Sequence, residues 1–520
     1  MNRFVIALSA SALVLIPGCK LLGPDFARPK APVSAEYKEA PPGWKSAQPQ
    51  DQALRGNWWE TYRDPVLNDL VSQVSVSNQT LAQAEARYRQ ARALVAQARS
   101  EYFPLFDLNA TSTRAKAGQG GSGEIGSRGA QNAHRIGVNA SWEPDLWGRI
   151  ARSVEAQAAG AQASAADIEA TRLSLQADLA QSYFALRAVD SQQRLLQASV
   201  KAFEDSLKLT QNRYDAGVVA RVDVVQAETQ VRQTQAQAID VGVQRAQLEH
   251  AIAVLVGKPP AELNLPRAPL DGIAPPRVPL GLPSELLERR PDISAAERRV
   301  AAANAQIGVA QAAYFPTITL SGSAGFASST IGDLFSTPAR FWSLGAALAQ
   351  TLFDGGARRA RVQQQVALYD ETVAAYRQTV LTSFQEVEDN LASLRILEEE
   401  STVQNEALAG ARRSVELALN QYKSGIVSYL NVLTAQTTAL TSERTAVDLQ
   451  SRRLAASVQL VRALGGGWDP STMPTPQQVE AKPSESPVPK NGAASEGEAA
   501  ESGFMGGMKR AWCSVFACKD

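Results

Sequence analysis

The sequence predicts a mainly α-helical protein with a small β part, built from two internal repeats. A stretch from Gly148 to Gly257 recurs from Gly356 to Gly465 in the same register, with one short turn near its middle. Each copy is a long proline-free run that gives way to a turn and a second run, and alternating apolar and polar segments precede it. Repetition at a fixed period means that each copy is one supersecondary unit. We therefore expect two long antiparallel helical hairpins, each accompanied by a β-hairpin.

The helical runs have the composition and spacing of coiled coils. No proline occurs between Arg149 and Ala216, where strong helix formers dominate, and at 1.5 Å per residue such a run spans roughly 100 Å. Gly217 and Gly425 suit the left-handed position after a helix C-terminus, so we expect them at the tips of the turns. By helices alone, a cytosolic structural coiled coil is an equal alternative. Apolar side chains with 4-3-4-3 spacing define the seam of the first copy: Leu175, Leu179, Leu186, Val189, Leu196, Val200, Phe203 and Leu207.

The first 18 residues are typical of a lipoprotein signal peptide. Arg3 supplies a positive charge, and the apolar stretch after it is too short to be a stable membrane helix. The stretch ends in Ile16-Pro-Gly-Cys19, which resembles a bacterial lipobox. We therefore expect cleavage before Cys19 and lipidation of Cys19, with ordinary secretion as the alternative. Lys20 follows where an aspartate would favour retention in the inner membrane, so the resemblance indicates the outer membrane.

Proline content and periodicity divide the rest of the chain. A proline-rich, extended strap is expected after the signal peptide, and each repeat opens with a helical pattern, the first over Val66–Ser100 and the second from Pro283. A proline-rich linker separates the repeats, and a tail without apolar periodicity is expected to be disordered. The expected segments are the strap 19–57, the first repeat 58–257, the linker 258–281, the second repeat 282–467 and the tail 468–520.

Two segments predict β-hairpins, over residues 105–142 and 317–352. Apolar and polar residues alternate with period two in both, which is typical of strands with one apolar face. Four strands are too few to close a barrel, since about eight is the smallest usual number. The strands either pair within a sandwich or are pooled by several chains. We favour pooling, because three chains would supply twelve strands around a wide lumen.

The composition offers no basis for an enzyme or a nucleic-acid-binding protein. Lys plus Arg and Asp plus Glu both total 52, so no net charge favours nucleic acid. The two histidines, His134 and His250, have no second ligand at metal spacing. No glycine-rich phosphate loop and no Ser, Cys and His arrangement of a nucleophilic site is present. We therefore expect no catalytic residue, no metal and no cofactor.

A series of motifs in fixed order resembles the outer-membrane factor lipoproteins, the TolC-like channels of tripartite efflux pumps. The resemblance covers Cys19 to Trp468 and implies a homotrimer, with a twelve-stranded outer-membrane barrel that continues into a periplasmic helical tube. It also implies docking to a periplasmic adaptor (membrane fusion) protein and to an inner-membrane transporter, often of the resistance-nodulation-division type. After the lipobox the motifs are Gly23-Pro-Asp-Phe26, Trp58-Trp59, Asp64-Pro65, Tyr102-Phe103-Pro104, Trp142-Glu-Pro-Asp-Leu-Trp-Gly148, the repeated Tyr-x-x-Gly turn, Gly281–Asp292 and Phe353-Asp-Gly-Gly356.

The resemblance also implies a gate at the two turns, which would form the periplasmic tips. Tyr422 matches the gate tyrosine of the family, and Asn431 and Thr434 occupy positions where relatives carry acidic rings. Neither residue is acidic, so polar residues near the first turn would supply the locking contacts instead. The alternative is that all of these are solvated turn residues. The first-turn candidates are Tyr214, Asp215, Arg221 and Asp223.

The resemblance implies passive conduction of small molecules from a periplasmic pump to the outside. Two alternatives stay open at this stage. One is a channel of the same kind that serves protein secretion, because the cargo is selected by the pump. The other is a periplasmic coiled-coil adaptor lipoprotein that makes no pore.

Overall fold

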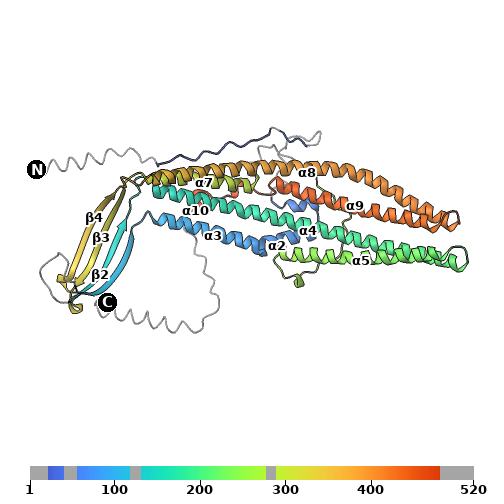
Figure 1. The fold of residues 1–520 in the computed structure, drawn as a ribbon, viewed down its shortest axis with the longest axis horizontal. Helices are drawn as coiled ribbons and strands as arrows, with labels where there is room; N and C mark the ends of the chain where they lie inside the picture. Colours follow the sequence, from blue (N-terminus) through green and yellow to red (C-terminus); the bar gives the residue numbers. More distant parts are fainter. Residues whose placement is uncertain (1–20, 35, 40–55, 117–129, 277–288, 481–520) are drawn as a thin grey trace. The chain divides into compact units, whose positions relative to one another are not determined.

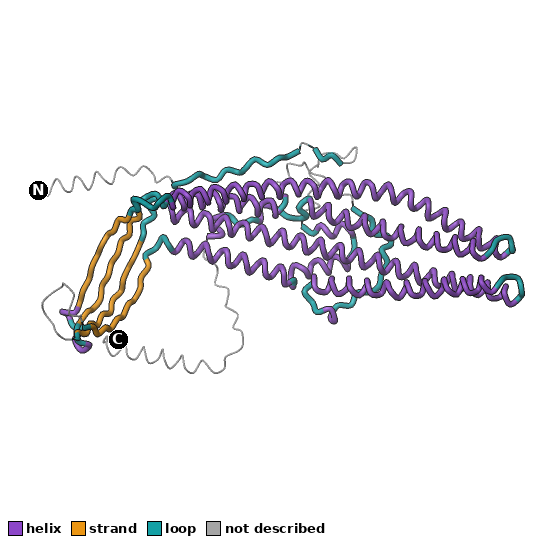
Figure 2. The backbone as a smooth tube through the Cα atoms, viewed as in Figure 1, coloured by secondary structure: helices purple, strands orange, loops and turns teal. Residues whose placement is uncertain are grey.

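The computed structural model describes residues 21–34, 36–39, 56–116, 130–276 and 289–480. The signal peptide, Cys19 and Pro283 lie outside these ranges, as do residues 481–520. Helices form most of the described chain, and four strands form one sheet. The predicted fold class, mainly α with a small β part, is confirmed (Figures 1 and 2).

Each repeat contains a long helix, a tight turn and a shorter returning helix. Gly217 and Gly425 occupy the turns with positive φ values of 71° and 77°. In the first turn, the Gly217 N–H donates to the Tyr214 carbonyl and the Val218 N–H donates to the Arg213 carbonyl, both at 2.8 Å. This pair of bonds satisfies the last carbonyls of the helix and reverses the chain. The helices are α4 (Arg149–Asp215) and α5 (Arg221–Leu255) in the first repeat, and α8 (Ala357–Lys423) and α9 (Tyr429–Ala463) in the second.

The helix α4 packs against the largest number of neighbours. It contacts α5, α9 and two shorter helices, α3 (Gln79–Ser100) and α7 (Pro291–Ala312), whereas α8 packs against α7 and α9 (Figure 1). Most of the predicted seam of α4 is buried, which agrees with coiled-coil packing. The buried seam residues are Leu179, Leu186, Val189, Leu196 and Phe203.

The helical pattern over Val66–Ser100 forms two helices rather than one. The first, α2 (Pro65–Ser77), ends at Asn78, and α3 begins at the next residue. The Asn78 side chain accepts from the N–H groups of Thr80 and Leu81 at 2.8 and 3.0 Å, which caps α3. Its amide nitrogen also donates to the Leu255 carbonyl at 2.7 Å, at the end of α5. Tertiary contact at Asn78 therefore breaks a pattern that periodicity reads as continuous.

In the second repeat, Arg290 rather than an asparagine donates to a carbonyl at the end of the returning helix. Arg290 precedes α7 and donates to the Ala463 carbonyl at the end of α9, at 3.0 Å. Its guanidinium also binds Asp292 and Glu386, both at 2.6 Å. Because it is charged and buried, Arg290 needs these two carboxylates. An asparagine in one repeat and an arginine in the other thus satisfy the carbonyls at the end of a returning helix.

The four strands pair in chain order, all antiparallel, so the two β-hairpins lie side by side. The strand β2 begins at Gln131, and β4 ends three residues before Leu352, the predicted end of the second hairpin. The unpaired edges within the described residues are β1 and β4. The strands are β1 (Leu105–Ala115), β2 (Gln131–Trp142), β3 (Thr317–Ser328) and β4 (Arg340–Ala349).

The described part of the N-terminal strap lies along α4, α7 and α8. Arg152, which is buried, donates to the Leu22 carbonyl at 2.9 Å and to the Asp25 carboxylate at 2.7 Å. Farther along, the Lys38 N–H donates to Glu388 at 2.8 Å. The strap is held through its backbone groups and through charged side chains such as Asp25, and neither kind of contact requires helical or strand periodicity in its sequence.

The expectation of a disordered tail from residue 468 onward is wrong for residues up to 480. The short helix α10 (Pro476–Glu480) packs against α3 and α4. Val479 is buried between Val95 and Ala161, and Gln162 donates to the Pro474 carbonyl at 3.0 Å. One buried valine in a segment this short gives no periodic signal, so composition alone could not show it. Cys513 and Cys518 lie outside the described residues.

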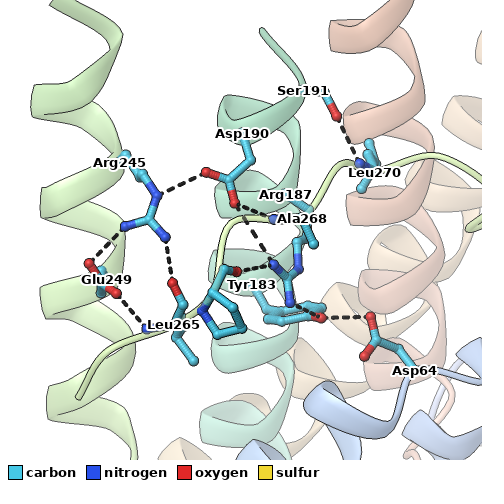
Figure 3. Close-up of polar contacts among 11 residues, drawn as sticks. Asp64, Tyr183, Arg187, Asp190, Ser191, Arg245, Glu249, Leu265, Ala268 and Leu270 are labelled. Atoms are coloured by element: carbon cyan, nitrogen blue, oxygen red, sulfur yellow. Dashed lines mark hydrogen bonds and ion pairs between the residues drawn. The ribbon is translucent and has the colours of Figure 1, made fainter. Parts of the chain in front are cut away.

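A buried polar network fastens the linker to the first repeat (Figure 3). Asp190 of α4 accepts from Arg245 of α5 at 2.9 Å and from the Ala268 N–H at 3.2 Å. Arg245 also donates to the Leu265 carbonyl at 2.7 Å. Around the next turn of α4, Arg187 donates to the Tyr183 hydroxyl at 2.8 Å. Because both carboxylate oxygens of Asp190 are bonded, the buried charges are paired and their desolvation cost is offset.

Candidate functional site at the two helical turns

The two turns are joined by a residue that lies just before the first of them. The Arg213 guanidinium of α4 donates to the Tyr422 carbonyl in the last turn of α8 and lies 4.5 Å from the centroid of the Tyr422 ring. The Tyr422 hydroxyl donates to the Thr210 hydroxyl of α4 at 3.2 Å. The backbone carbonyl, the ring and the hydroxyl of Tyr422 are therefore all contacted by the first repeat, and Tyr422 is buried.

Tyr429 completes the buried cluster at the second turn. It begins α9 and packs its ring edge-on against Tyr422, with centroids 5.9 Å apart. Ala227 and Val432 cover the remaining surface. The Tyr429 hydroxyl has no hydrogen-bond partner among the described residues. Burial, and then the nearby Tyr422 and Asp223, raise the pKa of Tyr429 to about 12.

The four candidate residues at the first turn lie in two different environments, one exposed at the first turn and one close to the second repeat. Arg221 is exposed and its guanidinium lies 5.9 Å from the ring centroid of Tyr214, within the same hairpin. Asp215 is exposed and accepts from Gln211 at 2.8 Å. Asp223 is half-buried and lies near Tyr429 of the second repeat. Of these four residues, Asp223 is therefore the one that the structure places beside the second turn.

Asn431 and Thr434 lie on the exposed side of α9, about one turn apart. Thr434 donates to the Leu430 carbonyl of its own helix at 2.9 Å. Within the described residues, neither side chain forms a hydrogen bond with the Tyr422 cluster or packs into it. Two residues farther from the tip than Thr434, the buried Gln436 donates to the Ser206 hydroxyl at 3.0 Å and links α9 to α4.

Arg213 and Tyr429 are site residues that the motifs do not point to. The repeat itself contained a signal for both. Arg213 corresponds to Gln421 in the second copy, and Tyr429 corresponds to Arg221 in the first. The contact between Arg221 and Tyr214 is thus the counterpart of the contact between Tyr429 and Tyr422. At these two positions the copies carry different residues and have different neighbours.

The side chains around Tyr422 hold the two hairpins together. Among the described residues, they include no set of groups suited to catalysis. Within the described ranges, no group of three or more His, Cys, Asp or Glu side chains is placed to bind a metal ion. His134 shares a hydrogen bond of 2.8 Å with the Ser112 hydroxyl on the sheet, far from the turns in sequence. The contacts at the turns are a cation over a ring, a hydrogen bond from a charged guanidinium, a neutral hydrogen bond between hydroxyls, and apolar packing. All of these can break and reform without a chemical reaction.

None of the helices in the described part of the chain combines the length and apolar character needed to cross a membrane.

Comparison with known proteins identifies the family. The model of the outer membrane efflux protein family matches residues 70–258 and 282–466. The pyoverdine export outer membrane protein OpmQ of Pseudomonas aeruginosa is 33% identical over 469 residues, which cover 89% of this chain and 98% of OpmQ. The toluene efflux pump outer membrane protein TtgC of Pseudomonas putida is 32% identical over 486 residues, which cover 93% of this chain and 99% of TtgC.

The fold agrees with the sequence comparison. The solved structure of the outer-membrane channel OprN superposes with a TM-score of 0.79 at 32% identity, covering 86% of this chain and 99% of OprN. Both matched segments of the family model coincide with the two repeats. The chain is therefore a member of the outer membrane efflux protein family, a TolC-like channel protein of the outer membrane.

Proposed function

We propose that three copies of this chain form one exit duct that conducts small molecules passively from a periplasmic pump to the outside of the cell. The observation that carries the proposal is the sheet. Its four strands leave β1 and β4 unpaired within the described residues. Unpaired edges are normally covered or joined to another chain. Three copies joined edge to edge would give twelve strands and remove every edge.

The two faces of the sheet fit this arrangement. Side chains alternate along each strand, so the strand pairing assigns every residue to a face. One face is mainly apolar and the other carries mainly small polar side chains, which is the pattern of a membrane strand with lipid on one side and water on the other. The apolar face includes Phe106, Leu108, Ile136, Val138, Leu320, Phe326, Trp342, Leu344 and Leu348. Several of these are strongly exposed in one copy, such as Trp342 at 77% and Leu344 at 81%.

The helices of a single chain, like its sheet, have sides that no other described element covers. In one chain α5 packs mainly against α4, and α8 packs against α7 and α9, so both have sides without a neighbour. Large apolar side chains are exposed on these helices, for example Ile239 at 77% and Val403 at 62%. Contact between α5 of one copy and α8 of the next would bury them, because apolar surface is driven out of water. Twelve long helices from three copies would then enclose a tube.

The partners follow from the role of the duct. We infer a periplasmic adaptor protein and an inner-membrane transporter, of the resistance-nodulation-division type, because a passive duct needs a pump to drive its cargo. Relatives are named for pyoverdine export and for toluene efflux, both small molecules, which favours small-molecule efflux over protein secretion. The amphipathic strands argue against an adaptor that makes no pore.

The position of the strap supports lipid attachment at Cys19. Leu21 packs against Gly148, where an added Cβ would lie 2.6 Å from the Leu21 side chain. Gly148 lies between the end of β2 and the start of α4, so Leu21 lies where the sheet meets the helices. Cys19 precedes Leu21 by two residues in the sequence, so a lipid attached to it would enter the membrane next to this junction. Mass spectrometry of the mature chain should find a lipidated N-terminal Cys19, and an unmodified N-terminus would exclude the anchor.

We propose that the cluster around Tyr422 holds the duct closed. Opening requires the two hairpins to move apart at their tips, a change between two packed arrangements that an adaptor would bias. Arg213 and Thr210 of the first repeat connect to Tyr422 of the second there, and Asp223 lies close enough to Tyr429 to raise its pKa. The exposed Asn431 and Thr434 are available to face their counterparts in neighbouring copies. Tyr214, Arg221 and Asp215 would fix the shape of the first tip.

Electrical recording tests the proposed function. The purified full-length chain is added to planar lipid bilayers at fixed voltage in potassium chloride. We expect discrete conductance steps of one size class from a heat-resistant oligomer. Absence of any step from folded, oligomeric protein would contradict the duct. A deletion strain exposed to a panel of drugs, dyes, solvents and metals would then identify the cargo.

A further inference from the structure

The polar face of the sheet carries one acidic and one basic side chain within the four strands, Asp107 and Arg135. Asp107 lies near the helical end of β1 and accepts from Asn139 at 2.8 Å. Arg135 pairs with Thr111, four residues farther along the strand. At about 3.3 Å per residue the two charges are roughly 13 Å apart along the strand direction. The acidic and the basic side chain on this face therefore lie at different levels along the strands.

The Arg135 side chain is held in place by a ring from another strand. Its guanidinium carbon lies 4.1 Å from the centroid of Phe341, which belongs to β4. Phe341 pairs with Gly325 of β3, and Gly325 pairs with Gly137 of β2. These two glycines leave the row without side chains, so the ring can lie across it and reach β2. An added Cβ at Gly137 would lie 3.1 Å from the ring.

This arrangement presents a positive charge with free donors. Arg135 is exposed, and no ion pair links it to a carboxylate within the part of the chain that the structure describes. Stacking on a ring face uses the flat side of the guanidinium and leaves its N–H groups at the edge free to bind an anion. It also restricts a long side chain that would otherwise move freely in the lumen. The charge is thus fixed near the wall at one level of the sheet.

We propose that Arg135 forms an anion-selective zone in the lumen of the duct and lowers the barrier for small anionic cargo. The inference rests on the proposed function, because three chains are needed to place three Arg135 side chains around one lumen. Rings of arginine or lysine are a usual device for anion selection in pores. A lumen with low-dielectric walls also concentrates the field of such a ring. Phe341 is the positioning residue, since it holds the charge and contacts no anion itself.

The test is the reversal potential of reconstituted channels across a tenfold gradient of potassium chloride. Relative to the unsubstituted chain, Arg135→Gln should lower the chloride-to-potassium permeability ratio by roughly two- to tenfold, because a fixed charge in a narrow lumen changes local ion concentration by such factors. Arg135→Lys retains the charge and should keep most of the ratio. Phe341→Leu should give an intermediate ratio, since the charge remains but is no longer held.

The matched control is Arg114→Gln. Arg114 lies on β1, three residues from the partner of Arg135, and its side chain is on the opposite, apolar face. The Arg114→Gln substitution removes one positive charge, as Arg135→Gln does, but on the face outside the lumen, so the permeability ratio should not change. Equal ratios for Arg135→Gln and Arg114→Gln in conducting channels would overturn the inference. A chain that forms oligomers without conducting would instead overturn the proposed function, so the two failures are distinguishable.

Discussion

The Arg213 guanidinium donates to the Tyr422 carbonyl and stacks on the ring of the same residue, 4.5 Å from its centroid. Arg213 lies at the end of one long helix and Tyr422 at the end of the other, so the contact joins the two repeats at their tips. A cation at the C-terminus of a helix is also stabilised by the helix dipole. One side chain thus serves as a link between hairpins, a cap for α8 and a cover for a buried tyrosine.

Arg213→Gln should favour the open duct. The substitution removes the stacking and the charged hydrogen bond, which are each worth about 1–2 kcal/mol for partly buried groups. Together they amount to about 2–4 kcal/mol, and because 1.4 kcal/mol changes an equilibrium tenfold, the closed-to-open equilibrium should shift toward the open state by roughly 30- to 1,000-fold, which raises the open probability of single channels. The measurement is single-channel recording in planar bilayers.

Arg221→Gln is the control for this prediction. Arg221 has the same charge and lies close to the same tip, but it contacts Tyr214 within its own hairpin. Its loss should leave the open probability within about twofold of the unsubstituted channel, since exposed cation contacts contribute little. An equal effect of the two substitutions would show that charge at the tip matters and that the link between hairpins does not.

Tyr429→Phe should make the protein more resistant to alkaline pH. Burial raises the pKa of Tyr429 to about 12, whereas an unfolded tyrosine ionises near 10. The unfolded state therefore loses this proton first, so the stability that Tyr429 contributes is complete below pH 10 and is lost as the pH rises toward 12. The phenylalanine variant lacks this loss. Melting temperatures at pH 8 and pH 11 should differ less for the variant than for the unsubstituted chain.

The control for Tyr429→Phe is Tyr62→Phe, which removes a buried hydroxyl that has a hydrogen-bond partner. The Tyr429 hydroxyl has no partner among the described residues, so its removal at pH 8 should be neutral or stabilising. Tyr62 is also buried, but its hydroxyl shares a hydrogen bond of 2.7 Å with Ser457. Tyr62→Phe should therefore destabilise by about 1 kcal/mol at pH 8. A larger loss for Tyr429→Phe than for Tyr62→Phe would contradict the assignment of an unsatisfied hydroxyl.

Asp190→Ala should be among the most destabilising single changes in the helical part. It leaves the buried Arg245 and Arg187 without their shared carboxylate. Breaking a buried pair costs about 3–5 kcal/mol. Asp271→Asn is the comparison, since Asp271 also anchors the linker to α4, through Arg194, but both side chains are more than half exposed. That change should cost less than about 1 kcal/mol. Chemical denaturation in detergent measures both, and similar costs would contradict the role given to the network.

Substitutions at Asn78 should separate its two functions. Asn78→Asp keeps an oxygen that caps α3 but removes the donor to the Leu255 carbonyl, whereas Asn78→Ala removes both. A lost N-cap costs about 1 kcal/mol and a lost buried hydrogen bond a similar amount. Both variants should therefore be destabilised in chemical denaturation, with Asn78→Ala affected more. A fully stable Asn78→Asp variant would show that the link to α5 contributes nothing.

Much of the helical architecture could be predicted because its signals are local. The turns at Gly217 and Gly425 follow from composition and from the requirement for positive φ, and they recur in both repeats. The strands follow from period-two alternation. In contrast, the break between α2 and α3 at Asn78 depends on contact with α5, and the ordered structure of residues 470–480 depends on contacts with α3 and α4. Such tertiary contacts leave no periodic pattern in the segment that makes them.

The candidate site was predicted less completely than the fold. Tyr422 was named for its place in a motif, and the structure shows it buried between the repeats. Arg213 and Tyr429 were missed because their importance depends on which helix ends meet in space. Arg221 was named with the first turn, yet its contact is confined to its own hairpin. Motifs place residues along a chain, whereas a link between hairpins is a property of packing.

The central claim is that three chains close one sheet through contacts between β4 of one copy and β1 of the next. Disulfide cross-linking across this edge in membranes tests it most directly, in a background without the two C-terminal cysteines. At least one pairing should give covalent products that end at three chains. Products that continue beyond three chains, or a chain that stays monomeric with every pairing, would contradict the claim. The variants combine Thr111→Cys with Ser343→Cys, Gly345→Cys or Ala347→Cys, in a Cys513→Ser, Cys518→Ser background.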